Sequence, residues 1–115
     1  MSEIILYGIP NCDKVRAARK WLEERGVLYR FWDLRKDGLD EALLQRWLQA
    51  VGLKTLVNTR SATWRQLDGA ARAAILNGDL QGLAAHPTLI KRPLLDVDGQ
   101  ILVGFDPERW AEVLA

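Results

Sequence analysis

The feature that most constrains the fold is an apolar segment that leads, after a short turn, into a helical pattern. Residues 4–7 are apolar and β-prone, and they end at Gly8. Apolar residues then recur at helical spacing over residues 13–25, and Gly26 ends the run. The apolar face of this helix is formed by Val15, Ala18 and Leu22. The sequence therefore predicts a strand followed at once by a helix.

The next segments extend this start into a larger fold. Residues 27–34 are apolar and aromatic and predict a second strand, which completes a βαβ unit with parallel strands. Residues 40–85 show no strand alternation, so we expect a helical subdomain there, inserted between strands two and three. Its first helix begins at Asp40, a suitable N-cap.

Strands return near the C-terminus. Residues 93–97 and 100–103 flank Asp98-Gly99, which is a strong signal for a two-residue hairpin turn. Pro107 then suits the first turn of a C-terminal helix. We expect one α/β domain over residues 1–115, in the order β-α-β, helical insert, β-β-α.

Composition excludes several classes of function. The formal net charge is +1, so no general electrostatic attraction to nucleic acid is predicted. No apolar run reaches membrane-spanning length, and we expect a cytoplasmic monomer without a membrane partner. One cysteine and one histidine are too few for a transition-metal site of the usual kind.

The single cysteine, Cys12, lies between the predicted first strand and the predicted first helix. Unpaired N–H groups and the positive end of the helix dipole favour a thiolate at such a position. Lys14 and Arg16 add positive charge nearby, whereas Asp13 opposes them. The alternative is a buried structural cysteine, but the polar neighbours suit a partly exposed, reactive thiol.

Three segments carry a family resemblance: Asn11-Cys12, Asn58-Thr59-Arg60, and residues 86–93 with the sequence His-Pro-Thr-Leu-Ile-Lys-Arg-Pro. In their order and spacing, the chain resembles the arsenate reductase (ArsC) and Spx family of thioredoxin-fold proteins, in particular its small YffB-like branch. The resemblance runs from about residue 4 to residue 114. It implies a thioredoxin/glutaredoxin-like fold with a four-stranded mixed sheet and a helical insertion.

The resemblance also implies site residues. Cys12 corresponds to the nucleophilic cysteine, and Asn11 precedes it as a candidate binding residue. Arg60 and Arg92 correspond to two arginines that hold the oxyanion and its thiol adduct. Pro93 corresponds to the cis-proline that faces the active cysteine.

Two departures from the family pattern bear on the chemistry. Phe105 stands near the place of the third family arginine, which favours reduction of thiol adducts over reduction of arsenate. Val15 stands where Cys-x-x-Cys members of the Spx branch have their second cysteine, so an external thiol must resolve the adduct. The carboxylates of glutathione suit arginine side chains.

The leading hypothesis is an oxidoreductase: a glutathione-dependent thiol reductase with no bound cofactor, glutathione as cosubstrate and glutaredoxin as a further partner. Glutaredoxin-linked arsenate reduction and a non-catalytic, Spx-like regulator that binds RNA polymerase are the alternatives. A Cys12–His86 pair is a weaker possibility, and we expect a structural role for His86. The phosphatase pattern Cys-x5-Arg is absent, because position 18 is alanine. We expect the five tryptophans in the core or in subdomain packing.

Overall fold

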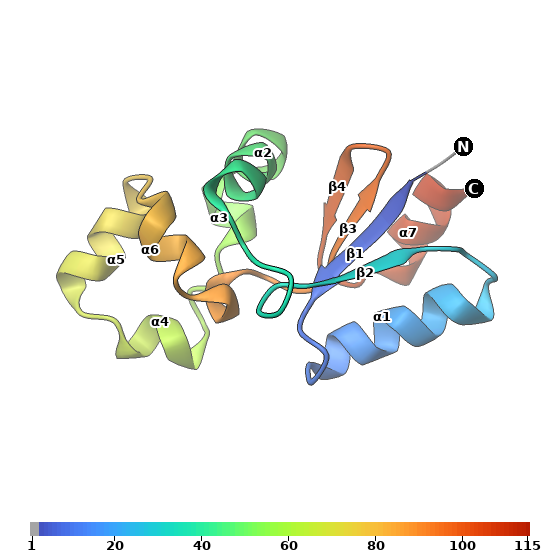
Figure 1. Cartoon of the computed structure of the whole chain (residues 1–115), viewed down its shortest axis with the longest axis horizontal. Helices are drawn as coiled ribbons and strands as arrows, with labels where there is room; N and C mark the ends of the chain where they lie inside the picture. Colours follow the sequence, from blue (N-terminus) through green and yellow to red (C-terminus); the bar gives the residue numbers. More distant parts are fainter. Residues whose placement is uncertain (1–2) are drawn as a thin grey trace. The chain divides into compact units, whose positions relative to one another are not determined.

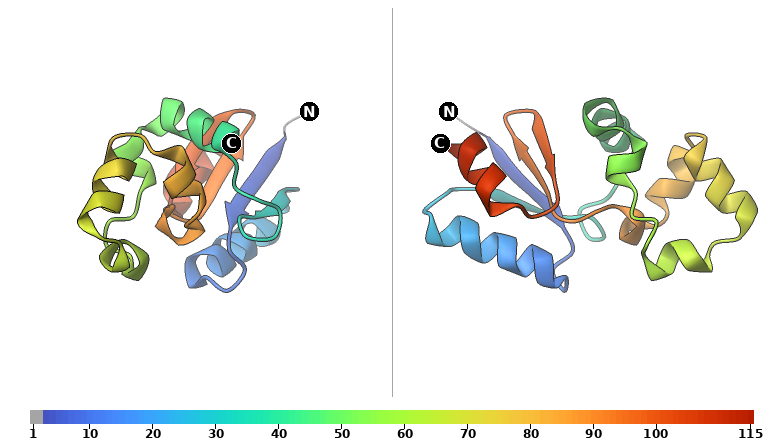
Figure 2. Two further views of the ribbon diagram at one scale, coloured as in Figure 1. Left: turned by 60° about the vertical axis from the view of Figure 1, so that its left-hand side comes forward. Right: turned by 180° about the vertical axis from the view of Figure 1, so that it is seen from behind.

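The computed structural model describes residues 3–115, which form two compact units (Figures 1 and 2). The sheet unit holds the chain up to Asp37 and again from Arg92 to Ala115. The helical unit holds Gly38–Lys91. No helix among residues 3–115 has the length and apolar character needed to cross a bilayer.

The sheet unit contains a four-stranded mixed sheet and two helices. Its elements are β1 (Ile4–Gly8), α1 (Asp13–Glu24), β2 (Arg30–Asp33), β3 (Leu94–Val97), β4 (Gln100–Val103) and α7 (Pro107–Leu114). The strand order is β2-β1-β3-β4, with β1 and β2 parallel and the other pairs antiparallel. This arrangement confirms the predicted thioredoxin-like α/β fold.

One face of the sheet and the two helices form the core of this unit. Leu6, Leu95 and Leu102 are aligned across β1, β3 and β4 and are almost fully buried. Leu22 of α1 and Trp110 of α7 join the same cluster. A helix that packs on a sheet must present such an apolar stripe, and α1 does so with the spacing that the sequence predicted.

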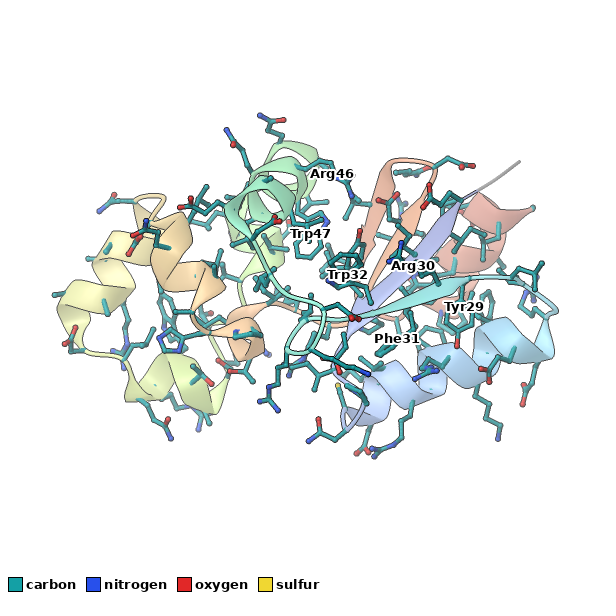
Figure 3. The ribbon with its side chains drawn as sticks, viewed as in Figure 1. Tyr29, Arg30, Phe31, Trp32, Arg46 and Trp47 are labelled. Carbon is teal, nitrogen blue, oxygen red and sulfur yellow. The ribbon has the colours of Figure 1, made fainter. Side chains whose placement is uncertain are left out.

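Strand β2 is shorter than predicted at its start. The Val27 N–H donates to the Leu22 carbonyl at 3.0 Å, so the chain still closes the end of α1 at that point. In β2 the side chains alternate, and Phe31 lies on the side of α1 whereas Trp32 lies on the other (Figure 3). Arg19 of α1 stacks 4.3 Å from the Phe31 ring centroid and donates to the Tyr29 hydroxyl. Burial raises the pKa of Tyr29, although that hydrogen bond opposes the rise.

The helical unit consists of short helices. They are α2 (Glu41–Val51), α3 (Leu53–Leu56), α4 (Ala62–Gln66), α5 (Gly69–Leu76), α6 (Leu80–Ala84) and a 3-10 turn, η1 (Pro87–Leu89). The sequence predicted the α-helices of this unit but not η1. Its buried residues include Leu44, Trp47, Leu56, Ile75, Leu83 and Leu89. Two extended segments join at an isolated bridge between Val57 and Ile90.

Side-chain caps begin most of these helices. Asp40 accepts from the Leu43 N–H at 2.8 Å, as predicted for the start of α2. The same role at α4, α5 and α6 is taken by Ser61, Asp68 and Asp79. Each cap satisfies a backbone donor that the helix itself leaves unpaired.

Candidate functional site

The candidate site lies at the edge of the sheet that is formed by the ends of its strands, where several chain segments leave or enter them. Because Tyr7 pairs with Leu94 and Leu94 pairs with Val103, the end of β1, the start of β3 and the end of β4 share this edge. The Gly104 N–H donates to the Pro93 carbonyl at 2.8 Å, which ties two of the segments together. The loop with Asn11 and Cys12 leaves the sheet at the same edge (Figure 1).

Gly8 sets the path from β1 into this loop. A Cβ atom at Gly8 would lie 2.7 Å from Val15 Cγ2 and 3.0 Å from Val15 Cγ1, closer than side chains tolerate. Val15 itself is fully buried in the first turns of α1. The missing side chain therefore allows the start of α1 to approach the end of β1. Sequence reasoning recognised Gly8 only as the end of a strand, because the spatial partner is not visible in the sequence.

Cys12 is the N-cap residue of α1 and is partly exposed. Its N–H donates to the Ile9 carbonyl at 3.1 Å, and its carbonyl accepts from the Arg16 N–H at 2.9 Å. The side chain makes no capping hydrogen bond. Cys12 thus stands at the N-terminus of a 12-residue helix, where backbone N–H groups are left without partners inside the helix. Among residues 3–115 no cluster of three His, Cys, Asp or Glu side chains that could ligate a metal ion is present.

Charged side chains follow Cys12 at the start of α1. The Arg16 guanidinium donates to the Asp13 carboxylate, and both side chains are exposed. The negative charge of Asp13 is therefore partly compensated. A pocket of about 430 Å³ lies beside the first turns of α1, lined by Asp13, Lys14, Ala17 and residues 103–106. One lysine, Lys14, and two carboxylates, Asp13 and Asp106, thus line the same pocket.

Arg92 and Pro93 belong to the same unit as Cys12. The Arg92–Pro93 bond is cis, as the resemblance implied, and Pro93 is buried. Two guanidinium nitrogens of Arg92, Nε and Nη1, are shielded from solvent and have no hydrogen-bond partner among the described residues. Shielded donors of a charged group are costly when left unpaired, so an anionic ligand at Arg92 would be stabilised.

Arg60 belongs to the helical unit and is exposed. Its N–H donates to the Asn58 side-chain oxygen at 3.1 Å, and its carbonyl accepts from Arg65 Nη2 at 2.8 Å. These two hydrogen bonds hold the backbone of Arg60, whereas its side chain is exposed. His86 lies in the same unit, where its main chain bonds with Leu83 and Leu89 around η1. Asn11 is exposed in the turn before Cys12.

Phe105 takes part in an aromatic cluster instead of standing free at the site. Its ring lies 5.0 Å from Trp110 and 6.1 Å from Trp21 by centroid distance, in both cases close to edge-to-face. Trp110 is fully buried, as expected for a core tryptophan. Phe105 thus supplies an apolar wall to the pocket beside α1.

A mixed four-stranded sheet, with a cysteine at the start of α1 and a cis-proline before β3, defines a thioredoxin-like protein. Residues 7–113 match the ArsC family, and the chain belongs to that family.

Relatives and solved structures agree with this membership. An uncharacterized protein of Haemophilus influenzae is 41% identical over 113 residues, which cover 97% of this chain and 99% of the relative. The global transcriptional regulator Spx 2 of Bacillus anthracis is 26% identical, over 96% of this chain and 86% of its own length. A solved structure of a YFFB protein superposes with a TM-score of 0.91 at 40% identity, covering 97% of this chain and 99% of that one.

Proposed function

We propose that this protein is a glutathione-dependent thiol reductase in which Cys12 is the nucleophile. The observation that carries the proposal is the place of Cys12, partly exposed and without a capping hydrogen bond at the N-terminus of α1. A thiolate is the attacking form in disulfide exchange, and this helix end favours negative charge. The proposal puts the protein in a reducing compartment, the cytoplasm, as a monomer.

The chemistry needs two exchange steps. The Cys12 thiolate attacks the glutathione sulfur of a mixed disulfide, forms a Cys12–glutathione disulfide and releases the substrate thiolate, which takes up a proton. A second glutathione thiolate then attacks the bound glutathione sulfur, which regenerates Cys12 and releases oxidised glutathione. Because the chain has no other cysteine, the second thiol comes from glutathione or from a glutaredoxin.

Anionic groups of the ligand would be held by cations near the thiol loop. The unpaired donors of Arg92 suit a carboxylate, and the Arg92–Pro93 segment directly precedes β3, the strand that pairs with β1. Lys14 lies in the wall of the pocket beside α1, whose mixed charge fits the carboxylates and ammonium of glutathione. We assign Asn11, in the turn before Cys12, to the same ligand as a further candidate. Arg60 belongs to the helical unit, and its part in holding this ligand stays a prediction from the resemblance.

A coupled assay tests the proposal. Reduction of the mixed disulfide of glutathione and cysteine would be followed through glutathione reductase and NADPH. We expect turnover with the wild type and none above background with Cys12→Ser. Wild-type turnover that equals the Cys12→Ser background would reject the proposal.

Arsenate reduction is a second candidate because the chain belongs to the ArsC family. Phe105 speaks against it, since a phenyl ring packed on Trp21 and Trp110 cannot neutralise an oxyanion. The same assay with arsenate, glutathione and glutaredoxin should give weak turnover or none. Efficient arsenate turnover would replace thiol reduction as the main activity.

A non-catalytic regulator is the candidate from another class, supported by the relatives that are Spx regulators. A pull-down with purified RNA polymerase, using wild type and Cys12→Ser, distinguishes it from the enzyme. Retention of the polymerase by both proteins, without reductase turnover, would favour the regulator.

A further inference from the structure

We propose that the helical unit holds a binding site for a small organic anion with an apolar body. A pocket of about 690 Å³ lies within this unit. It is lined by Leu53, Lys54, Val57, Asn58, Thr59, Arg60, Leu76 and Lys91. Three cations and three aliphatic side chains face one space of a size typical for small-molecule sites.

The cations of this pocket have no acidic partner in their own unit. The acidic residues of the helical unit are Asp40, Glu41, Asp68 and Asp79. The three aspartates accept backbone N–H groups as helix caps, and Glu41 stands in the first turn of α2. None of the four lines the pocket. The carboxylates of the unit are thus committed to helix starts.

Two other arginines of the helical unit, Arg65 and Arg72, show the contrast. Arg72 donates to the carbonyls of Trp64 and Arg65, at 3.0 Å and 2.8 Å. Arg65 in turn donates to the carbonyl of Arg60. These two arginines stabilise the chain around α4. For Lys54, Arg60 and Lys91, the part of the chain that the structure describes provides no ion pair, which leaves their charge available to a ligand.

The backbone around the pocket is held in place. The Lys91 N–H donates to the Leu56 carbonyl at 2.8 Å, and the Asn58 N–H donates to the Leu89 carbonyl at 2.7 Å. These bonds flank the Val57–Ile90 bridge and fix the two extended segments against each other. A site on such a fixed backbone loses less conformational entropy when it binds.

The apolar wall defines the second half of the ligand. Leu76, at the end of α5, is 54% exposed, which is unusual for a large aliphatic side chain in this protein. Leu53 and Val57 complete the wall. A ligand that joins a carboxylate or phosphate to an alkyl or aryl group would satisfy both halves. This inference does not depend on the thiol chemistry of Cys12.

Octanoate is a suitable probe, with acetate as the anion-only control and 1-octanol as the apolar-only control. Titrations of the full-length Cys12→Ser protein would be followed by amide chemical shifts. We expect octanoate to shift amides of residues 53–60, Leu76 and Lys91, and to bind roughly tenfold more tightly than either control. Raising the salt concentration should weaken it.

Variants identify the contacts. Lys54→Gln and Lys91→Gln should each weaken octanoate binding roughly three- to fivefold, since exposed charges contribute modestly. Leu76→Glu should weaken it more, and Lys36→Gln, an exposed lysine of the sheet unit, should leave it unchanged. Shifts outside the pocket, equal binding of 1-octanol, or unaltered affinity in both lysine variants would overturn the proposal. Because every arm lacks the thiol, none of these outcomes bears on the reductase proposal.

Discussion

The starts of the helices differ between two regions of the molecule. In the helical unit, α2, α4, α5 and α6 begin at an aspartate or serine whose side chain accepts a backbone N–H. In the sheet unit, α7 begins in the same way at Asp106. By contrast, α1 begins at Cys12, whose side chain forms no capping hydrogen bond.

The capped helix starts stabilise their helices, whereas the start of α1 carries a thiol in place of a good cap. Aspartate and serine are among the best N-cap residues, and cysteine is not. The backbone of Cys12, with φ −96° and ψ 127°, has the extended conformation that caps adopt. A better cap would therefore fit there. With cysteine at this position, the start of α1 lacks the roughly 1 kcal/mol by which a serine or aspartate cap would raise the free energy of unfolding. The thiol instead lies beside N–H groups that the helix leaves unpaired.

The largest expected effect is a slower addition of glutathione to Cys12 when Arg92 is replaced. Arg92→Ala should slow the addition of glutathione to Cys12 roughly ten- to hundredfold, because a charge-assisted hydrogen bond to an anion is lost. The free energy of unfolding of the Arg92→Ala protein should change little, because the Nε and Nη1 atoms of Arg92 have no hydrogen-bond partner to lose. The measurement is the rate of adduct formation by mass spectrometry. A rate within twofold of the wild type would remove Arg92 from the site.

Arg72→Ala is the matched control for Arg92→Ala. It removes hydrogen bonds to the carbonyls of Trp64 and Arg65. We expect a lower free energy of unfolding and an unchanged rate of glutathione addition in the folded protein.

The next effect concerns the approach of α1 to β1. Gly8→Ala would push a methyl group into Val15 and should lower the free energy of unfolding by about 1–3 kcal/mol. Urea denaturation measures this. Gly69→Ala is the control, since nothing lies within 4 Å of a Cβ there, and it should be neutral or slightly stabilising. Equal effects of the two substitutions would contradict the close approach.

A smaller effect is expected at a capped helix. Asp68 accepts from the Ala71 N–H at 2.7 Å, so Asp68→Ala should lower the free energy of unfolding by about 1 kcal/mol. The exposed Glu112→Ala should change it by less than about 0.5 kcal/mol. If the two variants unfold at the same urea concentration, the Asp68 side chain does not stabilise the start of α5.

The smallest effect has the opposite sign. Cys12→Ser places a better cap at the start of α1 and should raise the free energy of unfolding by about 0.5–1 kcal/mol. Thermal or urea unfolding under reducing conditions measures it. A destabilised Cys12→Ser protein would mean that the sulfur contributes to packing and that its role is structural.

Much of this architecture could be predicted from local patterns. Apolar, β-prone runs located the strands and helical spacing located the α-helices, while Asp98-Gly99 located the hairpin, where both residues have positive φ. The start of β2 was placed too early, because the hydrogen bond from Val27 to Leu22 extends the end of α1. A closing turn made of apolar residues looks like the start of a strand when only the sequence is considered.

The site was predicted only in part, because much of it depends on contacts between distant residues. Cys12 stands out by its place between a strand and a helix. The unpaired donors of Arg92 and the fit of Gly8 against Val15 require coordinates. The pocket around Lys54 and Lys91 joins segments more than thirty residues apart, so no local pattern indicates it.

The central claim is that the folded structure activates Cys12 toward glutathione. The most direct test is the rate at which oxidised glutathione adds to the wild-type protein, compared with the same protein unfolded in urea. We predict one glutathione per chain, removable by reduced glutathione, and addition roughly tenfold faster in the folded state. An equal or slower rate in the folded state would contradict the claim, because the thiol would then gain nothing from its place at the start of α1.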